Sequence, residues 1–79
     1  MRAAIVLPDL GPIRVSLSVW FAGPGDAVYE GDRVVEVLAG GATFDVSCPA
    51  TGKLAEQTAW PDDPLATGQV LGWIEVEND

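Results

Sequence analysis

The sequence contains no histidine and only one cysteine, Cys48, among its 79 residues. A nucleophile triad needs a base such as histidine, and one cysteine cannot build a zinc cage, so we expect neither a catalytic site nor a metal site. A lone cysteine also excludes a disulfide within the chain and gives no sign of an oxidising compartment. We therefore expect a cytoplasmic protein that is not an enzyme.

Basic residues are few, with four Lys and Arg against 12 Asp and Glu and a formal net charge of −8. This charge repels nucleic-acid phosphates and anionic lipids, and it steers the chain toward basic protein surfaces. Alternatively, the charge only keeps a small domain soluble. No uninterrupted apolar run approaches the roughly 18 residues of a membrane span. We expect protein partners, with neither nucleic acid nor a membrane among them.

No window shows the apolar spacing of an amphipathic helix, so we expect no helix longer than a single turn. Alternation of period two dominates instead. Arg14 to Trp20 places Val15, Leu17 and Val19 on one face of a half-buried strand. The opening residues read as a first strand, and similar runs occupy residues 33–38, 43–46 and 70–76. The pattern predicts an all-β chain.

An internal repeat appears when the sequence is shifted by 37 residues. The matched positions are turn formers and apolar residues: Pro12 with Pro49, Ala22 with Ala59, Pro24 with Pro61, Asp26 with Asp63, Gly31 with Gly68, Leu17 with Leu54, Val28 with Leu65, Val34 with Leu71, and Val37 with Ile74. Each copy is too short to fold alone, so we expect residues 1–79 to form one domain, a barrel or sandwich with quasi-twofold symmetry.

Two alternating runs meet at a Gly-Gly pair in the stretch VEVLAGGATFDV, residues 35–46. A two-residue hairpin turn of type I′ needs positive φ at both central residues, which glycine adopts without steric cost. We expect Gly40 and Gly41 to form the tip of a central β-hairpin that joins the two copies.

Five motifs resemble those of the lipoyl domains of 2-oxo acid dehydrogenase acyltransferases. In order along nearly the whole chain they are LPDLG (7–11), VSLSVW (15–20), GDAVYEGD (25–32), VSCPATGKL (46–54) and GQVL (68–71). The resemblance implies a flattened β-barrel of two four-stranded antiparallel sheets. In the wider lipoyl and biotinyl family, a lysine at the tip of the central hairpin carries a cofactor on a swinging arm, which moves acyl groups or carboxylate between active sites.

The tip of this chain departs from the family pattern, which usually reads Asp-Lys-Ala with an acidic residue two positions before the aspartate. The resemblance places Gly40 at the aspartate position, Gly41 at the lysine position and Leu38 at the earlier acidic position. The attachment lysine is therefore absent, and we expect no cofactor. The only lysine, Lys53, lies at the start of a strand after a loop, where it is best explained as a solvated surface cation.

Two functions are consistent with these residues. The first is a non-lipoylated interaction or structural module related to 2-oxo acid dehydrogenase complexes, whose partners include basic surfaces of a multienzyme complex. The alternative is a working carrier of lipoate or biotin, modified at an atypical place and shuttling acyl groups in an acyltransferase complex.

Alternation predicts that Trp20 faces away from the core, and Trp73, which breaks phase with Leu71, is also expected to face outward. Exposed tryptophan is enriched at binding hot spots, so both residues are candidates for protein contact. The alternative is that each indole lies flat on the barrel and covers aliphatic surface.

The remaining polar candidates have ordinary structural explanations. The paired carboxylates Asp26 with Asp32 and Asp62 with Asp63 are expected to accept hydrogen bonds from local backbone amides in turns. Nothing near Cys48 in the sequence lowers its thiol pKa, so no reactive cysteine is predicted.

Overall fold

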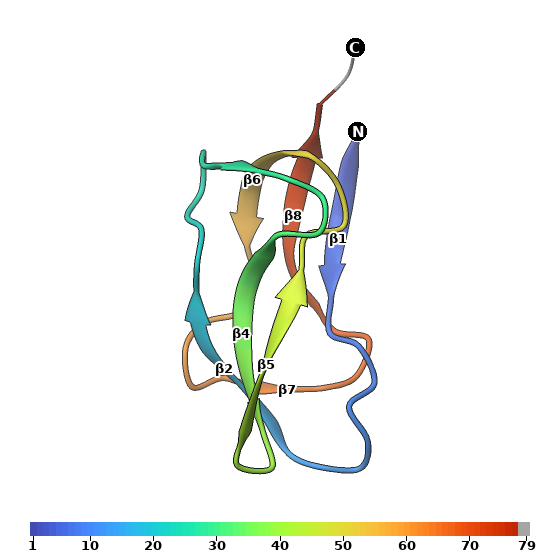
Figure 1. The fold of residues 1–79 in the computed structure, drawn as a ribbon, viewed down its shortest axis with the longest axis vertical. Helices are drawn as coiled ribbons and strands as arrows, with labels where there is room; N and C mark the ends of the chain where they lie inside the picture. Colours follow the sequence, from blue (N-terminus) through green and yellow to red (C-terminus); the bar gives the residue numbers. More distant parts are fainter. Residues whose placement is uncertain (78–79) are drawn as a thin grey trace.

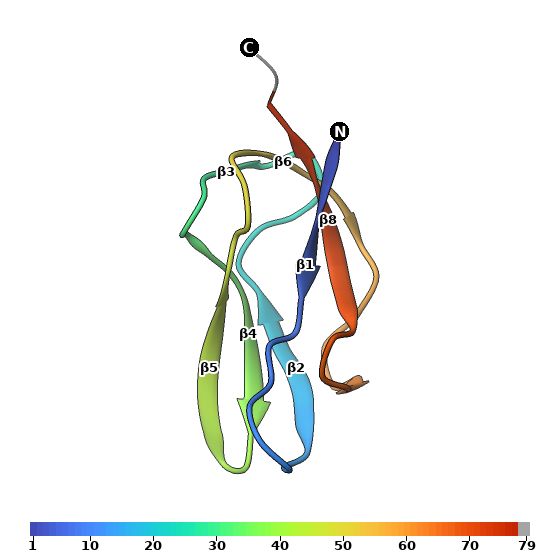
Figure 2. The ribbon, with the colours of Figure 1, turned by 90° about the vertical axis from the view of Figure 1, so that its right-hand side faces the viewer.

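The computed structural model describes residues 1–77, which form two four-stranded antiparallel sheets (Figures 1 and 2). The strands are β1 (Arg2–Val6), β2 (Val15–Trp20), β3 (Ala27–Val28), β4 (Arg33–Ala39), β5 (Ala42–Ser47), β6 (Gly52–Gln57), β7 (Pro64–Leu65) and β8 (Val70–Val76). One sheet has the order β1-β8-β6-β3 and the other β5-β4-β2-β7. The all-β architecture predicted from the sequence is confirmed.

The core lies between the two sheets and is made by the alternating apolar residues. Its fully buried members include Val35 and Val37 from β4 and Leu54 from β6. The barrel is elongated, with extents of 40 × 19 × 18 Å. The β4–β5 hairpin tip lies at one end of the long axis, and Met1 lies at the other (Figure 1).

A bulge in β2 changes which residues reach the core. Leu17 pairs with Val37 and Val19 pairs with Glu36, so Ser18 is an extra residue in the ladder. An extra residue reverses the alternation beyond it. The prediction that Val19 joins the core is therefore wrong, because its side chain is 41% exposed.

The same bulge overturns the outward orientation predicted for Trp20. Its side chain packs against the buried cluster, and its indole Nε1 donates a hydrogen bond to the carbonyl oxygen of Ala59 at 2.9 Å. The structure therefore supports the alternative, in which this indole covers apolar surface.

The bulge recurs 37 residues later, at Ala55 of β6, where Leu54 pairs with Ile74 and Glu56 with Trp73. Turn hydrogen bonds repeat at the same offset. The amide of Leu17 donates to the carbonyl of Asp63 at 3.1 Å, and that of Leu54 donates to Asp26 at 3.0 Å. The predicted repeat is confirmed for β2 to β4 and β6 to β8.

Side-chain bonds obey the same symmetry. The bond from Trp20 to the carbonyl of Ala59 has its counterpart in Gln57, whose Nε2 donates to the carbonyl of Ala22 at 3.0 Å. Trp20 and Gln57 are 37 positions apart, and so are Ala22 and Ala59. Each half thus bonds to the turn of the other.

The strands β1 and β5 follow a different offset. The amide of Leu7 bonds to Gln69, and the amide of Cys48, 41 residues later, makes the equivalent bond to Asp32. The loop before β2 is four residues longer than the loop before β6. Pro49 therefore corresponds to Pro8, and the predicted match of Pro12 with Pro49 is wrong.

The described residues contain no helix long and apolar enough to cross a membrane.

Candidate functional site at the hairpin end

The tip of the β4–β5 hairpin is a two-residue turn. Ala39 pairs with Ala42, and between them Gly40 has φ 57° and Gly41 has φ 85°. Positive φ at both positions is the signature of a type I′ turn. The predicted hairpin and its glycine tip are confirmed, and the turn lies at the bottom of the molecule in Figure 1.

The two glycines have different surroundings. A Cβ added at Gly41 would have no atom within 4 Å, so a side chain there would project into open space. A Cβ at Gly40 would lie 3.5 Å from Cδ1 of Ile13, which belongs to the loop between β1 and β2. Position 41 is thus the projecting position, and its positive φ is the main obstacle to another residue.

A shallow groove of about 300 Å³ adjoins the tip. It is lined by Arg14, Val15, Ser16, Leu38, Gly40, Gly41, Asp62 and Pro64. Leu38 is 43% exposed and nearby Ile13 is 45% exposed. Arg14 takes part in none of the ion pairs formed among residues 1–77. The hairpin end therefore presents apolar side chains together with one cation, Arg14, and one carboxylate, Asp62.

The opposite end carries the symmetry-related groove, with a volume of about 270 Å³. Its lining includes Thr51, Lys53 and Glu75, which lie 37 positions after Arg14, Ser16 and Leu38. Pseudo-symmetry thus gives the molecule two equivalent hollows with different side chains.

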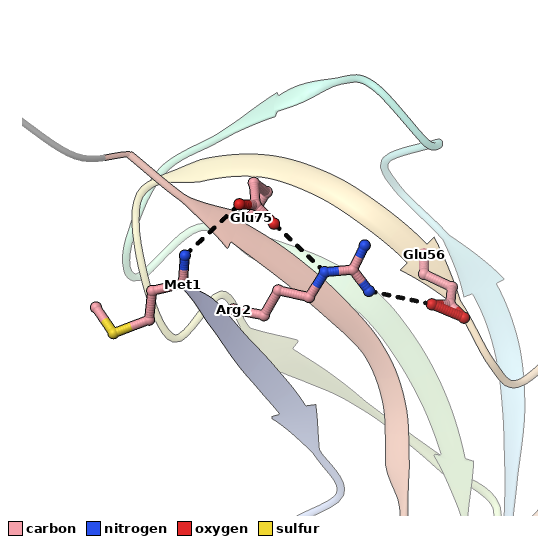
Figure 3. Close-up of polar contacts among 4 residues, drawn as sticks. All are labelled: Met1, Arg2, Glu56 and Glu75. Carbon is pink, nitrogen blue, oxygen red and sulfur yellow. Dashed lines mark hydrogen bonds and ion pairs between the residues drawn. The ribbon is translucent and has the colours of Figure 1, made fainter.

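Lys53 lies at this opposite end and is exposed on β6, as predicted. Its Cα partner in β8 is Glu75, which is engaged elsewhere: its carboxylate lies 3.6 Å from the Met1 amine and 3.3 Å from Nε of Arg2 (Figure 3). Arg2 also reaches Glu56 at 3.3 Å. The chain's only lysine side chain is therefore far from the hairpin tip and projects from a strand inside a sheet.

The three tryptophans differ in exposure. Trp73 pairs with Ala4 and Glu56 and lies next to fully buried Ile74, so it occupies the outer face of β8, as predicted, where it is half-buried. Trp60 is 53% exposed, more than Trp20 or Trp73. Sequence alternation did not single it out because Trp60 lies in a turn between β6 and β7.

Two of the turn carboxylates bond local amides, as predicted. Oδ2 of Asp26 accepts from the amide of Gly23 at 2.8 Å, and Oδ2 of Asp63 accepts from the amide of Trp60 at 2.9 Å. Asp62 instead has a positive backbone φ of 72°, as does Gly25, its counterpart in the 37-residue repeat. Within residues 1–77, no group of three or more His, Cys, Asp or Glu could hold a metal ion.

Cys48 is buried, and its Sγ donates to the carbonyl of Ala50 at 3.0 Å. Burial raises the pKa of the Cys48 thiol, and the carboxylates of Asp32 and Glu30 raise it further. A thiol of raised pKa is a poor nucleophile at neutral pH.

Comparison with known proteins finds the biotin and lipoyl family, described as "Biotin-requiring enzyme", matched over residues 3–74. The chain is 35% identical over 75 residues to the lipoamide acyltransferase component of a branched-chain alpha-keto acid dehydrogenase complex from Pseudomonas putida, covering 92% of this chain and 18% of that protein. The corresponding component from Pseudomonas aeruginosa is 32% identical, with the same coverage of each chain.

A third similar protein is the dihydrolipoyllysine-residue acetyltransferase component of an acetoin cleaving system from Pseudomonas putida. It is 32% identical over 63 residues, covering 80% of this chain and 17% of that protein. The chain thus spans less than a fifth of the length of the relatives it matches.

Proposed function

The chain belongs to the biotin and lipoyl attachment family, and on that premise we propose that it is a non-lipoylated interaction or structural module related to 2-oxo acid dehydrogenase complexes. Domains of this family carry a group for other catalytic sites and are not themselves catalytic. Here the hairpin scaffold is retained without its attachment amine. The module works in the cytoplasm, through contacts with protein partners.

The observation that carries the proposal is the glycine at the tip. Attachment of lipoate or biotin forms an amide and so requires a primary amine held where a ligase and distant active sites can reach it. Position 41 projects into open space, but glycine has no side chain to offer. Lys53 does not replace it, because its backbone lies in β6 between β3 and β8 at the other end of the barrel.

The hairpin end also differs chemically from a charged attachment site. Leu38 and Ile13 are exposed beside the turn, and Arg14 is the one cation of the adjoining groove. Apolar surface of this kind is typical of protein contact.

A working carrier is the second candidate, and the relatives favour it, since two are lipoamide acyltransferase components of dehydrogenase complexes. In that case the acyl-carrying group would be attached at Lys53.

Peptide mass mapping of the protein isolated from its own source separates the two functions. We expect the peptides containing Gly40 and Gly41, and that containing Lys53, to have unmodified masses. A lipoyl or biotinyl group on either peptide would overturn the proposal.

A further inference from the structure

The strand β5 is the longest edge strand of the barrel, with six residues, and it pairs with β4 on one side only. Figure 2 shows it at the margin of its sheet. The other edge strands differ: β3 and β7 have two residues each, β7 starts at Pro64, and β1 carries the ion-paired Arg2.

The turn fixes which backbone groups of β5 lie on the free edge. In a type I′ turn the flanking residues, Ala39 and Ala42, form a hydrogen-bonded pair. The symmetry-related bond, from the amide of Val76 to the carbonyl of Met1, measures 2.9 Å. Because bonded and non-bonded pairs alternate, Phe44 faces β4 with its backbone groups, whereas Thr43, Asp45 and Ser47 point theirs outward.

These outward groups are available to a partner. The side chains of Thr43, Asp45 and Ser47 are exposed, and none of the turn and loop hydrogen bonds of residues 1–77 uses their backbone. Three of the usual protections are missing, since β5 contains neither lysine nor proline and the extra residue of the β4–β5 ladder is Val34 in β4. A strand of this kind is a template for another strand.

The outer face of this edge is acidic. Asp45 lies directly across from Glu36, and two like charges at paired positions destabilise a sheet. Ser18 donates to Glu36 at 2.8 Å. Arg33 reaches Asp45 at 3.9 Å, and its guanidinium lies over the ring of Phe21, 4.5 Å from the centroid. A basic residue beside Asp45 would relieve this repulsion.

The inner face of the same edge is apolar. Phe44 is 43% exposed although its partner Val37 is fully buried, because no strand covers the free side of β5. An added strand that alternates apolar and basic residues would place its apolar side chains beside Phe44 and its basic side chains beside Asp45. A second copy fits poorly, since each chain carries a net charge of −8.

We propose that the free edge of β5 docks an extended basic segment of a partner protein, which joins this sheet as a fifth strand. The inference deepens the proposed interaction role and rests on it. Backbone hydrogen bonds to Thr43 and Asp45 provide the attachment, and the carboxylates of Asp45 and Glu36 select for positive charge.

The test is a titration of the isotope-labelled chain with a synthetic peptide of alternating lysine and valine, followed by NMR and amide exchange. We expect the amides of Thr43, Asp45 and Ser47 to gain protection. Thr43→Pro removes an outward donor without disturbing the pairing with β4, and should weaken binding at least about tenfold. The matched control, Ala4→Pro, removes an outward donor from the free edge of β1, at the position that corresponds to Asp45, and should leave binding unchanged.

A second variant keeps the test decisive if the proline variant unfolds. Asp45→Lys should weaken binding of the lysine peptide about tenfold and favour a glutamate–valine peptide, whereas Glu30→Lys, with the same change in net charge, should do neither. Protection at another surface, equal binding of the glutamate–valine peptide, or a homodimer that Thr43→Pro abolishes would overturn the inference. Mass mapping is independent: a modified tip overturns the proposed function, whereas failed peptide binding to an unmodified chain overturns only the edge inference.

Discussion

The indole of Trp20 in β2 lies over Gly72 in β8. A large side chain from one sheet thus fills the space that the missing side chain of a glycine leaves in the other sheet. Cη2 of Trp20 is 3.0 Å from the position that a Cβ at residue 72 would take. The carbonyl oxygen of Glu56 is 2.6 Å from the same position. In the other half, the position equivalent to Trp20 holds the smaller Gln57, and the position equivalent to Gly72 holds the larger Val35.

Gly72→Ala should therefore be strongly destabilising. The carbonyl of Glu56 belongs to the neighbouring strand and cannot move away without breaking the sheet, so we expect the free energy of unfolding to fall by about 2–4 kcal/mol. Urea denaturation measures this change. Gly41→Ala is the matched control, since it meets open space and pays only for positive φ, about 1 kcal/mol. Equal losses in the two variants would contradict the close approach of Glu56 and Trp20 to Gly72.

Trp20→Phe should cost about 1–2 kcal/mol, because it keeps an aromatic ring but leaves the carbonyl of Ala59 without its donor. Trp60→Phe provides the comparison, since Trp60 is 53% exposed and should change stability by less than about 0.5 kcal/mol. Thermal or urea unfolding of both variants checks the difference. A Trp60→Phe loss as large as that of Trp20→Phe would show that the hydrogen bond is not responsible.

Cys48 should make stability fall at alkaline pH. Because burial and the nearby carboxylates raise its pKa in the folded chain, the unfolded chain loses the thiol proton first as pH rises. The contribution is fully present below the unfolded pKa of about 8.5 and is lost as pH rises through the folded value. Between the unfolded and the folded pKa of this thiol, the free energy of unfolding measured in urea should fall more steeply with pH for the natural chain than for Cys48→Ala. Identical declines would contradict the raised pKa.

The same burial predicts slow alkylation of Cys48. Iodoacetamide at pH 8 should react with the folded chain much more slowly than with the chain in urea, because the thiolate is scarce and the sulfur is buried. Equal rates in the two conditions would indicate an exposed thiol.

The ion pairs of Arg2 should contribute little. Arg2, Glu56 and Glu75 are all about half exposed, and exposed ion pairs are worth less than about 1 kcal/mol. We expect Arg2→Gln to lower stability by less than this amount, and added salt to remove the difference. A larger loss that persists in high salt would mean that Arg2 supports β1 by packing.

Sequence alternation predicted the strands, the glycine turn and the repeat because each leaves a local signal: period-two burial, two adjacent glycines, and turn formers at equal spacing. It could not predict the bulges at Ser18 and Ala55, since an extra residue in one strand is visible only against its partner. The predicted orientation of Trp20 was wrong for this reason. The free edge of β5 was also invisible, because strand order is a property of the whole fold.

The central proposal is that position 41 is the attachment position of the family and that its glycine leaves the hairpin without an amine. Gly41→Lys, alone or with Gly40→Asp, should restore an accessible amine at the tip, at a cost in stability of about 1 kcal/mol for positive φ. Circular dichroism first verifies that these variants are folded.

The decisive measurement is the intact mass of the natural chain and of these variants after incubation with lipoyl ligase, lipoate and ATP. We predict that the natural chain gains nothing and that a folded Gly41→Lys chain gains one lipoyl group. A lipoyl group on the natural chain, or folded lysine variants that accept none, would contradict the account.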